Sequence, residues 1–139
     1  MIEFEVRRPL HGLSDAKVWS LVKDVSAMPR FWRGHREVIV LGSRGPDYEL
    51  RVRFAFPGPG NRGLARAHVD EAAMSVRIEY LRGPISGVVV TEVKDGELIT
   101  RWSVRGKGVL RLLEPWLRGH FMKGAREALE RIVREASQS

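Results

Sequence analysis

The sequence contains no cysteine, one asparagine (Asn61) and one glutamine (Gln138). Without cysteine there is no disulfide framework, no thiolate metal site and no cysteine nucleophile, so packing alone must hold the fold together. A cytoplasmic location is therefore expected. The scarcity of these labile residue types also gives the chain a thermophile-like composition.

Long apolar runs are absent as well. No stretch approaches the roughly 18 to 20 apolar residues that a membrane-spanning helix requires, so we expect no integral membrane segment. Residues 1–8 alternate apolar and charged side chains, whereas a signal peptide has a basic start and an unbroken apolar run. The 139 residues, of which 43% are hydrophobic and 29% charged, are typical of one globular domain spanning 1–139.

Acidic residues are fewer than basic ones. The chain has 17 Asp and Glu residues and 24 Lys and Arg residues, which gives a net charge of +7. Such a balance can attract nucleic acid. The arginines are spread along every segment, however, which favours a solvated surface over a binding patch. The adjacent Phe31 and Trp32 lie about 100° apart on a helix and cannot form one stacking platform. We therefore expect only one of them to face inward and consider nucleic-acid binding the less favoured hypothesis.

Seven segments alternate apolar and polar residues, the pattern of strands with one buried face. In the first of them, Ile2, Phe4 and Val6 alternate with charged residues. The predicted strands are 2–8, 37–41, 48–56, 63–71, 75–81, 87–94 and 97–105. Because six of them follow one another without an intervening helix, we expect an antiparallel meander.

The dipeptide Asp95-Gly96 favours a two-residue type I′ hairpin and so fixes the register of the last two strands. Counting back from this turn pairs Lys94 with Glu97, Val93 with Leu98, Thr91 with Thr100, Val89 with Trp102 and Gly87 with Val104. The face that carries Trp102 holds no charge, whereas the opposite face carries Glu92 and Arg101. We therefore expect Trp102 to face inward.

Two short helices are predicted after the first strand. The first covers 14–22 and is capped by Ser14. The second covers 27–32, with Ser26 as its N-cap, Pro29 in its first turn and Gly34 at its end.

The chain should end in a long amphipathic helix over 109–136, in which leucine, alanine and other apolar residues recur at steps of three and four. Its first half contains Pro115, Gly119 and Gly124, residues that disfavour helices. We expect a kink at Pro115.

Two stretches give the chain a resemblance to a known family. They are 16–25, where Val18-Trp19 is followed by Asp24, and 28–32, which reads Met-Pro-Arg-Phe-Trp. Together with the order of the predicted elements, they resemble the START-like helix-grip superfamily (SRPBCC), in its polyketide cyclase/dehydrase and lipid transport branch. The resemblance implies an α+β helix-grip fold, in which a strongly curved antiparallel sheet of about seven strands wraps around the long C-terminal helix. It also implies a cavity between sheet and helix.

The leading hypothesis is a protein that binds or transports a small hydrophobic or amphipathic ligand, such as a lipid, isoprenoid, quinone or polyketide-like molecule, without catalysis. Apolar side chains on the inward faces would line the site. Trp32 would stand at its entrance, and Tyr80, Thr91 and Thr100 could orient a polar group of the ligand. The candidate ligand-binding residues are Trp32, Phe54, Phe56, Tyr80, Thr91, Thr100, Trp102, Leu113, Leu117 and Phe121.

The alternative is an enzyme of the cyclase, aromatase or dehydratase type, which needs an acid or base that reaches the cavity. The candidates for such a group are His68, Glu79, Glu92, Arg101 and His120. Strand parity turns the two glutamates and the arginine outward, so no catalytic residue is assigned. The four histidines are far apart in the sequence, and neither a metal nor a cofactor is predicted. The sequence does not indicate a protein partner.

Overall fold

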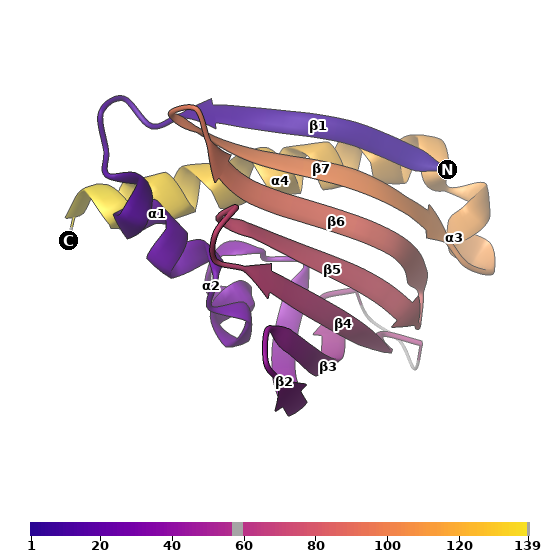
Figure 1. Ribbon diagram of the computed structural model, residues 1–139. Helices are drawn as coiled ribbons and strands as arrows, with labels where there is room; N and C mark the ends of the chain where they lie inside the picture. The colour runs from indigo at the N-terminus through magenta and orange to yellow at the C-terminus, as the bar shows by residue number, and fades with distance from the viewer. Residues whose placement is uncertain (57–59, 139) are drawn as a thin grey trace.

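The computed structural model describes residues 1–56 and 60–138, and its central feature is one antiparallel sheet of seven strands (Figure 1). The strands are β1 (Ile2–Pro9), β2 (His35–Arg44), β3 (Asp47–Phe54), β4 (Arg62–Asp70), β5 (Ser75–Arg82), β6 (Ile85–Lys94) and β7 (Glu97–Gly106). Their order in the sheet is β1-β7-β6-β5-β4-β3-β2. The last six strands therefore form the predicted meander, and β1 closes its far edge against β7.

The hairpin between β6 and β7 has the predicted register. Asp95 and Gly96 both have positive φ angles, 53° and 74°, as a type I′ turn requires. Lys94 stands opposite Glu97, and Val89 stands opposite Trp102. All five predicted residue pairs are confirmed, so the two-residue turn was sufficient to predict the register of these strands.

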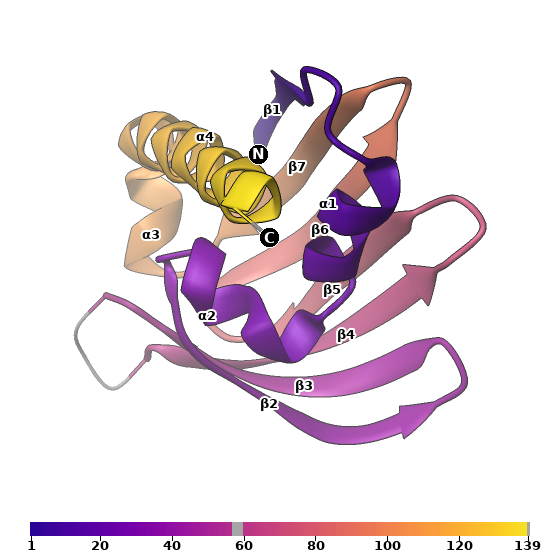
Figure 2. The ribbon, with the colours of Figure 1, turned by 90° about the vertical axis from the view of Figure 1, so that its left-hand side faces the viewer.

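The helices cover the concave face of this curved sheet (Figure 2). They are α1 (Asp15–Val22), a 3₁₀ turn η1 (Val25–Ala27), α2 (Met28–Phe31), α3 (Val109–Leu112) and α4 (Glu114–Gln138). The short helices α1 and α2 lie beside α4 and cover a further part of the concave face. The α+β helix-grip architecture predicted from the sequence is confirmed.

The predicted long helix is interrupted. The segment 109–136 was predicted as one kinked helix, but α3 ends at Leu112 and α4 begins at Glu114. Pro115 accounts for the break, because it has no N–H to donate to the carbonyl of Arg111 and its ring would clash there. As the second residue of α4 it sits in the first turn, where no such bond is required.

The second short helix also differs from the prediction. Ser26 lies inside η1, and its hydroxyl donates to Asp24 Oδ1 at 2.7 Å. Residue Ala27 occupies the N-cap position of α2, with no side-chain cap bond. The predicted cap is therefore wrong, because the 3₁₀ turn includes Ala27 and the helix starts one residue later than predicted. Pro29 is still near the helix start, as expected.

Two strand boundaries differ in ways that matter for the interior. Strand β3 ends at Phe54, so the predicted extension to Phe56 is wrong; the chain bends there, and Phe56 is 36% exposed. Strand β2 begins at His35 instead of Glu37, and its pairing with β3 shifts by one residue between these two positions. That shift is a β-bulge, which re-aims the side chains that precede it.

Candidate functional site

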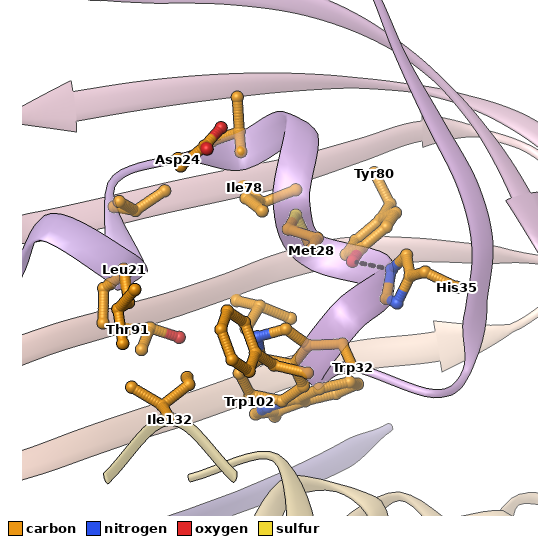
Figure 3. A pocket seen from close by; sticks show the side chains of 15 residues that line it. Leu21, Asp24, Met28, Trp32, His35, Ile78, Tyr80, Thr91, Trp102 and Ile132 are labelled. Carbon is orange, nitrogen blue, oxygen red and sulfur yellow. Dashed lines mark hydrogen bonds between the residues drawn. The ribbon is translucent and has the colours of Figure 1, made fainter. Parts of the chain in front are cut away.

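The inner face of the sheet, the segment from α1 to α2 and helix α4 enclose a small cavity (Figure 3). Its wall is mostly apolar, with side chains such as Leu21, Met28, Ile78, Val89 and Ile132. The cavity volume is about 30 Å³, which has room for about two water molecules. In this conformation the interior is therefore nearly filled.

An aromatic cluster around Trp102 forms one wall. The Trp102 ring is stacked on Phe4, with centroids 5.3 Å apart, and it also contacts Trp32 at 5.9 Å and Phe121 at 5.5 Å. These side chains come from β1, β7, α4 and the end of α2, so Trp102 joins four parts of the fold. Aromatic pairs of this kind contribute about 0.5–1.5 kcal/mol each beyond their buried area.

Both Phe31 and Trp32 line the cavity, so the expectation that only one of them faces inward is wrong. That expectation assumed that both belong to one helix. Helix α2 ends at Phe31, and Trp32 has an extended backbone with φ −95° and ψ 91°. The 100° rotation between helical neighbours therefore does not apply to this pair. Phe31 is buried, and Trp32 is half-buried against the core.

The two predicted threonines bond to each other. Thr91 Oγ1 and Thr100 Oγ1 are 3.0 Å apart and both side chains are buried. The indole Nε1 of Trp102 donates to Thr100 Oγ1 at 3.1 Å. Of the two threonines, Thr91 lines the cavity. Their hydroxyls thus hold Trp102 in place and already have protein partners.

The most unusual polar feature of the cavity is a buried His35–Tyr80 pair. His35 Nε2 and the Tyr80 hydroxyl are 2.7 Å apart, and the two residues are 6% and 3% exposed. Loss of solvation lowers the pKa of His35 to about 4, and it raises the pKa of Tyr80. Both groups are therefore neutral near pH 7. The second ring nitrogen, His35 Nδ1, is buried without a hydrogen-bond partner among the described residues.

Sequence reasoning considered His68 and His120 as the histidines that might reach the cavity, and it missed His35. His68 bonds to Asp47 at the surface, 2.8 Å away, and His120 is exposed and stacks on Trp116. Neither lines the cavity. Alternation counted backward from Val38 would turn His35 outward, but the β-bulge inserts one residue and turns it inward. The sequence pattern does not reveal this bulge, so it gives no signal that His35 faces the cavity.

The other predicted ligand-binding residues are distributed as follows. Trp32, Tyr80, Thr91 and Trp102 line the cavity. Phe54 packs against His35 and Tyr80, with ring centroids 5.4 and 5.9 Å away. Leu117 and Phe121 belong to α4; Leu117 is buried, and the Phe121 ring contacts Trp102. Phe56 and Leu113, at 36% and 44% exposed, lie outside the cavity lining.

The charged candidates lie away from the cavity. Arg101 pairs with Glu92 at 2.6 Å on the outer face of the sheet, as strand parity predicts. No group of three or more His, Asp or Glu side chains in the described residues could hold a metal ion. Within residues 1–56 and 60–138, no helix is long and apolar enough to cross a membrane.

Neither protein-family models nor curated protein sequences give a match to this chain. Several solved structures do match this chain. TTHA0849 from Thermus thermophilus has a TM-score of 0.78 and 13% identity over 99% of this chain and 97% of that one. The Zhui aromatase/cyclase from Streptomyces sp. R1128 has a TM-score of 0.68 and 17% identity over 99% and 93%. A STAR-related lipid transfer protein from Xanthomonas axonopodis has a TM-score of 0.65 and 12% identity over 94% and 84%. At such identities the comparisons establish the fold.

Proposed function

Starting from the helix-grip fold of the START-like (SRPBCC) superfamily, which this chain has, we propose that it binds and carries a small hydrophobic or amphipathic molecule. The proposal treats residues 1–139 as one domain that acts in the cytoplasm, in keeping with the absence of cysteine. A lipid, an isoprenoid, a quinone and a polyketide-like compound all fit the class. The ligand would lie between the sheet and α4, against the Trp102 cluster.

The observation that carries the proposal is the apolar cavity beneath α2. A buried apolar site with a few fixed polar groups is the usual form of a small-molecule site. The same fold occurs in proteins named as a lipid transfer protein and as an aromatase/cyclase.

A volume of about 30 Å³ cannot hold a ligand of this class, so the site must open. Helix α2 is the element best suited to move, because it has four residues and no side-chain cap. Helices this short have little stability of their own, and segments of low local stability are the ones that open around ligands. Half-buried Trp32, at the end of α2, would move with it.

This role of Trp32 can be tested with N-phenyl-1-naphthylamine, a neutral probe that fluoresces in apolar surroundings. We expect saturable binding to the wild type. In Trp32→Ala the dissociation rate should rise about three- to tenfold, because the variant loses an aromatic contact of about 0.5–1.5 kcal/mol and the cover over the cavity. Stopped-flow displacement measures that rate.

A matched control replaces the three exposed arginines around the same helix, Arg30, Arg33 and Arg36, with glutamine. Arg30 forms an ion pair with Glu135 at the surface, and such pairs contribute little. This variant should release the probe at the wild-type rate. The reverse pattern, with unchanged release in Trp32→Ala and altered release in the arginine variant, would favour the polyanion-binding alternative.

A cyclase or dehydratase-type activity is the second candidate, and the His35–Tyr80 pair is the observation that favours it. A general base is most effective when its pKa lies near the working pH. With a pKa of about 4, His35 is unprotonated at neutral pH but weakly basic. The pair is better suited to hold a ligand than to remove a proton from it, which is why we favour binding.

A further inference from the structure

Besides its two indoles, the cavity lining contains four polar side chains, and no polar atom of three of them is buried without a partner. Thr91 bonds to Thr100, Asp24 accepts a bond from Ser26, and Tyr80 bonds to His35. His35 Nδ1 is the exception, since it is buried and has no partner among the described residues. A buried polar atom without a partner is costly, typically by about 1–3 kcal/mol. Native structures keep such an atom where something else, such as a water or a ligand, meets it.

Counting protons shows what the pair offers. A neutral imidazole carries one N–H and one bare nitrogen. If Tyr80 donates to His35 Nε2, then Nδ1–H remains as a free donor and the Tyr80 oxygen as an acceptor. If Nε2–H donates to the Tyr80 oxygen, then the Tyr80 hydroxyl remains as the donor and Nδ1 as the acceptor. In either tautomer, the pair has one donor and one acceptor left over.

We propose that the His35–Tyr80 pair is the polar end of the ligand site, and that it binds an uncharged hydroxyl or carbonyl group on an otherwise apolar ring system. This inference rests on the proposed ligand-binding function. A carbonyl would accept from whichever group is the free donor, and a phenol or alcohol would donate to whichever is the free acceptor. The pair can therefore bind either the keto or the enol form of a ligand, because the protons of His35 and Tyr80 can take the arrangement that matches each form.

The surroundings favour a neutral group over a charged one. The charged side chain in the cavity lining is Asp24, which is exposed. An anion placed beside the pair would lose its solvation without gaining a cation, which costs far more than burying a hydroxyl. Apolar rings would meanwhile contact the apolar side chains that line the same cavity, such as Met28 and Ile78.

Two probes of the same shape test the inference: 2-naphthol, which carries a hydroxyl, and 2-methylnaphthalene, which carries a methyl group in its place. Calorimetric titration gives Kd for each probe with the wild type and with the double variant His35→Phe/Tyr80→Phe. The double variant removes both polar partners together, so it leaves no buried group unpaired. The preference for 2-naphthol, taken as the ratio of the two Kd values, should be about tenfold larger in the wild type than in the variant. Comparing ratios cancels the difference in hydrophobicity between the probes.

The imidazole nitrogens of His35 give a second readout by ¹⁵N NMR. Their shifts should change on addition of 2-naphthol, because hydrogen bonding of Nδ1 changes, and stay nearly constant with 2-methylnaphthalene. If both probes bind but the ratio is the same in both proteins, this inference is overturned while the proposed function stands. If neither probe binds the wild type, the proposed function fails and this inference fails with it.

Discussion

Lowering the pH from 6.5 to 4 is expected to reduce the free energy of unfolding by about 3 kcal/mol through His35 alone. Burial lowers the pKa of this histidine to about 4 in the folded protein, against 6.5 in the unfolded chain. Between these values the unfolded chain binds a proton that the folded protein does not, so stability falls as the pH falls. Above pH 6.5 the full stability is present, and below pH 4 this loss is complete.

Urea denaturation at a series of pH values measures the effect. The matched control is again His35→Phe/Tyr80→Phe, which has no group that titrates at this position. Glu71 and Glu114, whose pKa values are lowered by hydrogen bonds from Trp19 and from the chain's first amino group respectively, lose their contribution in both proteins and at lower pH. The difference between the two curves therefore isolates His35. Parallel curves from pH 6.5 to 4 would show that His35 is solvated in the folded protein, contrary to its burial.

Replacing Trp102 with alanine is expected to cost about 3–5 kcal/mol of unfolding free energy, which is the usual range for a large aromatic in a core. Trp102 is 8% exposed and contacts the rings of Phe4, Trp32 and Phe121. Loss of the indole would leave a cavity between β1, β7 and α4. Thr100 Oγ1 would also lose the hydrogen bond that it accepts from Trp102 Nε1. The midpoint of urea denaturation should fall accordingly.

Trp116→Ala is the control for this variant. Trp116 is 64% exposed and stacks on the exposed His120. A surface substitution of this kind changes stability by about 0.5 kcal/mol or less. If Trp102→Ala cost no more than Trp116→Ala, the aromatic cluster would not be the centre of the core.

Much of the fold could be predicted because local rules determine it. The Asp95-Gly96 turn fixed the register of β6 and β7, and alternation in the strands gave the buried face. The amphipathic pattern placed α4, although Pro115 divided the predicted helix in two.

The site was less predictable, because its key residues lie where the regular patterns break. A β-bulge turns His35 inward. Helix α2 ends before Trp32, so the angular spacing of helical residues does not apply to Trp32. The predicted strand began at Glu37 and so did not include His35, and helical spacing excluded one of two aromatics that both line the cavity. The volume of the cavity depends on how side chains fill the interior, which periodicity cannot describe. Tyr80 and Trp102 were predictable because they lie in regular strands.

The central claim is that the space beneath α2 opens to admit an apolar ligand. Its most direct test follows the indole N–H signals of the protein by ¹H–¹⁵N NMR during titration with 2-naphthol. Trp32 and Trp102 line the cavity, whereas Trp116 is exposed on α4. If the space opens, the shifts at Trp32 and Trp102 should be saturable and fit one binding site, with Trp116 unchanged. Shifts at Trp116 alone, or no saturable shift at any indole, would contradict it.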